Sequence, residues 1–92
     1  MDTPEIVVYT TQWCGECIFT KRLLKDWAVP FREVDISGDD AACEFVRGAT
    51  HGYLSVPTLV FPDGRVLVEP SRDALRSAID AQRTGRPPMG ST

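Results

Sequence analysis

Two cysteines, Cys14 and Cys17, lie where a strand-like run meets a helix-like run, and this turn constrains the whole fold. The strand-like run is Ile6–Thr10 and the helix-like run covers residues 18–27. A Cys-x-x-Cys pair at a strand-to-helix turn is typical of a thiol–disulfide centre. The N–H groups and partial positive charge of a helix N-terminus favour a thiolate there. We therefore predict that Cys14 is the exposed thiol at the turn and that Cys17 lies one helical turn along, within reach of a disulfide on Cys14.

The size and charge of the chain exclude several classes of protein. Its 92 residues make one small domain, which we expect over residues 1–84, with residues 85–92 as a disordered C-terminal tail. A net charge of −3 gives no electrostatic basis for binding nucleic acid or an anionic membrane. No apolar run approaches the roughly 20 residues that a membrane span needs, and the acidic start of the chain is unlike a signal peptide. We expect a cytoplasmic monomer, and in a reducing cytoplasm a close cysteine pair is more often catalytic or metal-binding than structural.

The first helix-like run carries apolar residues at the spacing of one helix face. Phe19, Leu23 and Trp27 recur at i, i+4 and i+8, and Ile18 and Leu24 widen the stripe. We expect this stripe to pack on a sheet.

The rest of the chain predicts a strand, a second helix, a hairpin and a third helix. Residues 31–36 alternate apolar and polar, as a half-exposed strand does. Asp39 is a candidate N-cap for the second helix and Ser71 for the third, and a Pro-Asp-Gly turn separates strand-like runs at 58–61 and 65–68. The order β-α-β-α-β-β-α predicts an α/β fold with a mixed four-stranded sheet flanked by three helices.

With this order of elements, the chain resembles the glutaredoxin branch of the thioredoxin superfamily, in particular the mycoredoxin-like and glutaredoxin-like proteins of bacteria. The resemblance covers about residues 5–83 and is carried by residues 9–17, 21, 34–36, 55–58, 61–64 and 69–71. No one of these motifs is specific. The Cys-x-x-Cys and the later Val56-Pro57-Thr58, each in its expected strand context, make the match strong.

The resemblance implies a thioredoxin-like fold and a thiol–disulfide oxidoreductase. Cys14 would be the nucleophile and Cys17 the resolving thiol. Pro57 would be a cis-proline facing them, and Val56 would offer its backbone N–H and C=O to an extended thiol substrate, as in strand pairing. The implied substrates are protein disulfides and mixed disulfides between proteins and a low-molecular-weight thiol of the glutathione or mycothiol type. No tightly bound cofactor is expected.

One departure from the family pattern lies between the two cysteines. Family members often have an aromatic residue at the position of Glu16. A carboxylate there disfavours a thiolate at Cys14 and repels an acidic thiol such as glutathione. Lys21, where the family usually has a lysine, could offset this charge.

Several other residues have both a structural and a functional interpretation. Trp13 is either packed or exposed for contact with a partner, and Ser71 either caps its helix or also holds a carboxylate of a bound thiol. We expect Cys43 to be a small buried hydrophobe, with a regulatory or dimer-forming thiol as the alternative. The loop residues His51 and Tyr53 either have no role in binding or contact a bound thiol.

Three functions remain open from the sequence. The leading hypothesis is a glutaredoxin-type oxidoreductase, and the second is a dedicated electron donor that thioredoxin reductase recharges and that serves ribonucleotide reductase. The third is a metal carrier, because Cys14, Cys17, Cys43 and His51 make four zinc ligands on paper. An iron–sulfur cluster shared by two copies belongs to the same class, since some relatives with a Gly at the position of Gly15 hold one. The metal hypothesis ranks low because the chain has no second closely spaced pair of cysteines.

Overall fold

The predicted order of elements is confirmed in the computed structural model, which describes residues 5–84. The strands and helices are β1 (Ile6–Thr10), α1 (Gly15–Asp26), β2 (Phe31–Asp35), α2 (Asp40–Ala49), β3 (Thr58–Val60), β4 (Val66–Val68) and α3 (Arg72–Thr84). The expected tail, residues 85–92, lies outside the described residues.

The four strands form one mixed sheet in the order β2-β1-β3-β4. Strand β2 runs parallel to β1, β3 runs antiparallel to β1, and β4 runs antiparallel to β3. In this register Tyr9 of β1 lies opposite Thr58 of β3. Because β3 runs against β1, the residues just before Thr58 lie beside the C-terminal end of β1, where the cysteine turn begins.

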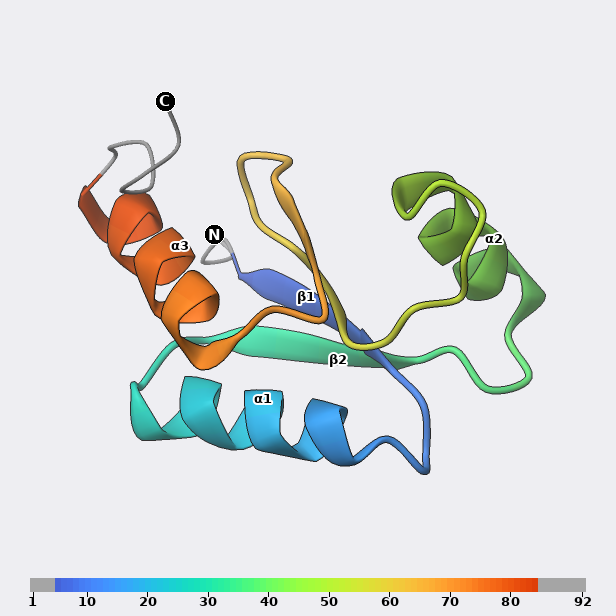
Figure 1. The fold of residues 1–92 in the computed structure, drawn as a ribbon, viewed down its shortest axis with the longest axis horizontal. Helices are drawn as coiled ribbons and strands as arrows, with labels where there is room; N and C mark the ends of the chain where they lie inside the picture. The colour runs from blue at the N-terminus through green and yellow to red at the C-terminus, as the bar shows by residue number, and fades with distance from the viewer. Residues whose placement is uncertain (1–4, 85–92) are drawn as a thin grey trace.

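Helices cover both faces of the sheet (Figure 1). Helices α1 and α3 lie together at the bottom and left of Figure 1 and share a hydrophobic core with β1 and β3. The largest buried side chains of this core include Phe61, Leu24, Leu59 and Ile79. Helix α2 lies apart at the right, and its Phe45 stacks on Tyr9 with ring centroids 5.1 Å apart. None of the helices within residues 5–84 is long and apolar enough to cross a bilayer.

The predicted apolar stripe of α1 is wrong in its N-terminal half. Ile18 and Phe19 are 56% and 52% exposed, whereas Leu24 is fully buried. The residues that face the sheet are Thr20, which is 3% exposed, and the apolar residues at i+3, i+4 and i+7 from it, Leu23, Leu24 and Trp27. Because the helix must also bury the second cysteine, it is rotated so that a threonine rather than a phenylalanine faces the sheet.

Both predicted N-caps are present. The side chain of Asp39 accepts a hydrogen bond from the Ala42 N–H at 3.0 Å, and the Ser71 hydroxyl accepts one from the Ala74 N–H at 3.1 Å. Each satisfies an N–H group that has no partner within its helix.

Helix α3 is tied to the end of α1 through Trp27. The guanidinium groups of Arg72 and Arg76 lie 5.6 and 5.0 Å from the centroid of its indole ring. Arg83 donates a hydrogen bond of 2.9 Å to the backbone carbonyl of Trp27. These contacts fix the start of α3 relative to α1, the two elements between which the groove described below opens.

Candidate active site: the Cys14–Cys17 pair

Cys14 is the N-cap of helix α1. Its Sγ accepts a hydrogen bond from the Cys17 N–H at 3.0 Å, and its carbonyl accepts the Ile18 N–H at 3.2 Å. Cys14 is half-buried and Cys17 is 1% exposed, and neither is in a disulfide. The Cys14 sulfur thus receives an N–H donor at the helix N-terminus, while Cys17 is buried.

The environment of Cys17 keeps it protonated. Burial, with the neighbouring Cys14 adding to the effect, raises the pKa of the Cys17 thiol from its ordinary value to about 12. A backbone hydrogen bond with Thr11 and the charge of Lys21 act in the opposite direction and are outweighed. Near neutral pH Cys17 is therefore a neutral thiol, so the two sulfurs are chemically distinct.

The segment before β3 faces the first cysteine. The Val56–Pro57 peptide bond is cis, as the resemblance implied. The Cys14 Sγ lies 3.9 Å from the Val56 carbonyl oxygen, at the limit for a hydrogen bond from sulfur. The Pro57 carbonyl accepts the Glu69 N–H at 2.8 Å, which anchors the segment to the end of β4. A backbone acceptor thus lies beside the Cys14 sulfur.

A groove of about 470 Å³ opens beside this pair. It is lined by α1, the cis-proline and the start of α3, through Glu16, Phe19, Thr20, Pro57, Glu69, Pro70, Ser71 and Arg72. Three of the residues expected to bind substrate, Glu16, Pro57 and Ser71, therefore share one groove. Its walls could hold the part of a substrate that extends away from the sulfur.

The groove carries more negative than positive charge. Within residues 5–84 the side-chain carboxylates of Glu16 and Glu69 have no hydrogen-bond or ion-pair partner. The one lining cation, Arg72, lies over the Trp27 ring and 3.9 Å from Asp73. The groove therefore has two unpaired carboxylates, and its cation interacts with Trp27 and Asp73 instead of with them.

The family of the chain follows from comparison with known proteins. The family model described as Glutaredoxin matches residues 6–67, more than half of the sequence. The chain belongs to the glutaredoxin family. Glutaredoxins are thiol–disulfide oxidoreductases that use low-molecular-weight thiols as co-substrates, and at this level the chain shares their activity.

Relatives and solved structures agree with this family. The chain is 39% identical over 79 residues to a protein of Mycobacterium tuberculosis named "Putative glutaredoxin", covering 86% of this chain and 94% of that protein. It is 29% identical over 77 residues to Mycoredoxin 1 of Corynebacterium glutamicum, covering 83% and 94%. The thioredoxin-like protein BC3987 superposes with a TM-score of 0.61 at 36% identity, covering 70% and 85%. A glutaredoxin from Archaeoglobus fulgidus, with a TM-score of 0.73 at 23% identity and coverage of 84% and 87%, shows the shared fold.

Lys21 pairs with Glu33 rather than with Glu16 in this glutaredoxin. Its Nζ donates a hydrogen bond of 2.8 Å to Glu33 Oε2, and the same oxygen accepts one of 2.7 Å from Thr10. The Lys21 hydrogen bond, followed by that of Thr10, holds the pKa of the Glu33 carboxyl below its ordinary value. β2 thus supplies the ion-pair partner of Lys21, and an offset of the effect of Glu16 on the thiols stays a prediction.

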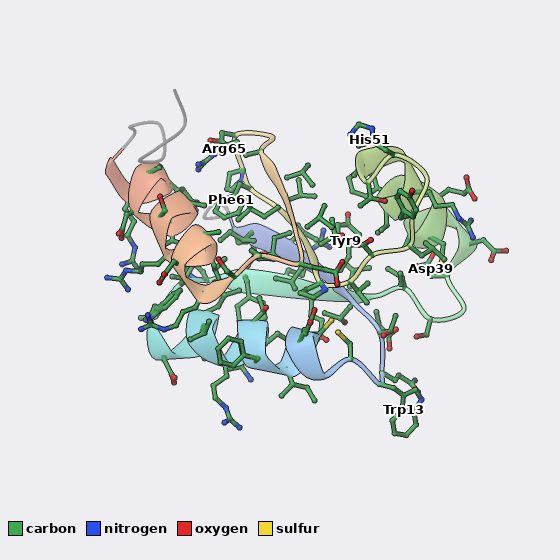
Figure 2. The ribbon with its side chains drawn as sticks, viewed as in Figure 1. Tyr9, Trp13, Asp39, His51, Phe61 and Arg65 are labelled. Atoms are coloured by element: carbon green, nitrogen blue, oxygen red, sulfur yellow. The ribbon has the colours of Figure 1, made fainter. Side chains whose placement is uncertain are left out.

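The remaining predicted residues lie away from the groove. Trp13 is 93% exposed and points into solvent from the turn before α1 (Figure 2), so it is not packed. His51 is exposed at the end of α2, well away from Trp13 (Figure 2). The Cys43 thiol, half-buried on α2, donates a hydrogen bond of 3.2 Å to the Ile36 carbonyl. Across the described part of the chain no three His, Cys, Asp or Glu side chains are grouped as metal ligands, so the four-ligand zinc set is not assembled there.

The charged residues Glu69, Arg72 and Glu33 were not predicted from the sequence as part of the site. Glu69 and Arg72 flank Ser71, and only the serine was expected to line the groove. Glu33 was expected only as a polar position of an alternating strand. No local pattern indicates that its carboxylate reaches a lysine 12 residues earlier.

Proposed function

We propose that this glutaredoxin reduces protein disulfides, and mixed disulfides between proteins and a low-molecular-weight thiol, with Cys14 as nucleophile and Cys17 as resolving thiol. The observation that carries the proposal is the difference between the two sulfurs. Cys14 receives an N–H at the helix N-terminus, whereas the Cys17 thiol has its pKa raised to about 12 by burial. Attack therefore begins at Cys14.

The reaction then follows from thiol–disulfide exchange. The Cys14 thiolate attacks one sulfur of the substrate disulfide, the substrate S–S bond breaks, and the other substrate sulfur leaves as a thiolate. Cys17 gives up its proton to that leaving group or to solvent and attacks the Cys14 sulfur. The mixed disulfide breaks, the second substrate thiolate is released, and the substrate's two-electron reduction is balanced by oxidation of Cys14 and Cys17 to a disulfide.

The Val56 segment and the groove would position the substrate. The Val56 backbone lies beside Cys14 and can pair with an extended substrate. Pro57 and Ser71 line the groove that receives the remainder. Because the Glu16 and Glu69 carboxylates have no partners among the described residues, the groove disfavours a thiol that itself carries carboxylates, such as glutathione. We therefore propose a co-substrate without carboxylates, of the mycothiol type.

A second candidate function is supported by Trp13 together with the acidic groove. An aromatic side chain that is 93% exposed, one residue before the nucleophile, suits contact with a protein partner. On this proposal the protein is an electron donor that thioredoxin reductase recharges, and its acceptor is an enzyme such as ribonucleotide reductase.

Reduction of the oxidised protein, followed by thiol counting, separates the two candidates. One reaction contains a low-molecular-weight thiol with its recycling enzyme, run once with glutathione and once with an uncharged thiol. The other contains NADPH and thioredoxin reductase. The leading proposal expects turnover with the uncharged thiol. Turnover with the reductase alone supports the second candidate and overturns the first.

A further inference from the structure

A second set of interacting side chains lies on the other side of the cysteines from the groove. Glu33 Oε2 on β2 accepts hydrogen bonds from Lys21 Nζ on α1, at 2.8 Å, and from Thr10 Oγ1 on β1, at 2.7 Å. Thr10 is 1% exposed, whereas the side chains of Lys21 and Glu33 are 24% and 39% exposed. One carboxylate oxygen is therefore fixed between a buried hydroxyl and a half-buried cation.

This set reaches the redox pair at two points. Lys21 follows Cys17 by one helical turn, at i+4, so both lie on the same side of α1. Thr10 precedes Thr11, whose backbone acts to lower the pKa of the Cys17 thiol. The positive charge of Lys21 also acts on Cys17, where it is the smallest of the influences on the thiol. A cation this close to the pair is expected to act strongly unless something holds or neutralises it.

We propose that Glu33 is a positioning residue for the redox pair: its carboxylate binds the Lys21 ammonium and so keeps the lysine from moving onto the Cys14 sulfur. The inference concerns the same cysteines as the proposed function and rests on it for its catalytic meaning. Because both side chains are partly exposed, the ion pair contributes little to stability. Its main effect is therefore on the potential at the sulfurs.

The chemistry gives a reason for such an arrangement. A thiolate becomes a weaker nucleophile as its conjugate acid becomes stronger. With Lys21 held by Glu33, the helix N-terminus is the chief source of positive potential at Cys14. The ion pair thus prevents the lysine from stabilising the thiolate so far that the attacking sulfur loses reactivity. It remains in place at neutral pH because Lys21 and Thr10 keep the pKa of Glu33 low.

The test is the pH profile of Cys14 alkylation by iodoacetamide, followed by mass spectrometry. Glu33→Gln keeps an oxygen that can accept from Thr10 and Lys21 but removes the negative charge. We expect the midpoint of the profile to move to lower pH. A shift of half a pH unit raises the thiolate fraction below the midpoint about threefold. Lys21→Met is expected to move the midpoint the opposite way.

The double variant Glu33→Gln/Lys21→Met distinguishes positioning from a direct effect of the carboxylate. If Glu33 acts through Lys21, the shift caused by Glu33→Gln falls to less than half when the lysine is absent. A shift of half or more in that background, or no shift in the single variant, overturns the proposal.

Glu44→Gln is the matched control. It removes a carboxylate that pairs with Arg47 on α2. Because α2 packs on Tyr9 and lies apart from α1 and α3, this substitution should leave the pH profile unchanged. Alkylation does not depend on turnover, so a protein that fails the functional assays still gives a readable profile. Failure of the proposed function and failure of this inference are therefore separate results.

Discussion

The Cys17 N–H donates a hydrogen bond of 3.0 Å to the Cys14 sulfur, while Cys17 itself is 1% exposed. One residue thus supplies both an N–H donor to the Cys14 sulfur and the buried thiol that resolves the mixed disulfide in the proposed mechanism. The arrangement is possible because the helix begins between the two cysteines. Several measurable consequences follow from it and from its surroundings.

The buried thiol of Cys17 should make the folded protein less stable in alkaline solution. The thiol pKa is raised from 9.0 to about 12 in the folded state. Above about pH 9 the Cys17 thiol is deprotonated in the unfolded chain but still protonated in the folded chain. The free energy of unfolding therefore falls by about 1.4 kcal/mol per pH unit until the pH approaches the folded pKa. Below about pH 9 the stabilisation is fully present.

Urea unfolding of the wild type and of Cys17→Ser, at about pH 8 and about pH 10, measures this effect. The stability of the wild type relative to the variant should fall by about 1–2 kcal/mol between the two pH values. Comparison with the variant removes the contribution of the other titrating groups. A difference that does not change with pH contradicts the buried, protonated state of Cys17.

The rotation of α1 predicts unequal costs for two substitutions on that helix. Leu24 is fully buried and Phe19 is 52% exposed. Leu24→Ala should lower the free energy of unfolding by about 2–5 kcal/mol because it leaves a cavity in the core. Phe19→Ala should cost about 1 kcal/mol or less. Denaturant titrations decide this, and a larger cost for Phe19→Ala would restore the stripe predicted from the sequence.

That helix shows what the sequence could and could not predict. The cysteine turn, the caps at Asp39 and Ser71 and the order of strands and helices follow from local signals, and the structure contains all of them. The rotation of α1 does not, because Thr20 is polar and nothing local indicates that it is buried. Tertiary packing sets the rotation, and a count of apolar residues detects only part of it.

The candidate site, like helix α1, could be predicted from the sequence only in part. Cys14 and Cys17, with Val56 and Pro57, were identified through motifs that recur in the family. The charges around them were not, because Glu33 and Glu69 reach the site from β2 and from the end of β4. Pairing between distant segments decides whether Lys21 meets Glu16 or Glu33, and the sequence alone does not show that pairing.

The exposed Trp13 should matter for protein substrates and little for folding. Its side chain is 93% exposed, so Trp13→Ala should change the free energy of unfolding by no more than about 0.5 kcal/mol. We expect the rate with a protein disulfide to fall while the rate with a small-molecule disulfide is kept. An equal loss with both substrates would show that the indole acts on the cysteine turn rather than on a partner.

The acidic groove should select against glutathione. In Glu16→Gln and Glu69→Gln the repulsion of a carboxylate-bearing thiol is reduced, so KM for glutathione should fall severalfold in each, with little change in KM for an uncharged thiol. The matched control is Glu44→Gln on α2, outside the groove. Unchanged selectivity in both groove variants would mean that the small thiol binds elsewhere.

The most direct test of the central claim compares Cys14→Ser with Cys17→Ser, using a mixed disulfide between a peptide and a small thiol as substrate. The account predicts that Cys14→Ser has no activity. Cys17→Ser should keep reduction of the mixed disulfide and lose reduction of protein disulfides, and mass spectrometry should find its trapped adduct on Cys14. An adduct on Cys43, or full dithiol activity in both single variants, would contradict the assignment of Cys14 as the nucleophile.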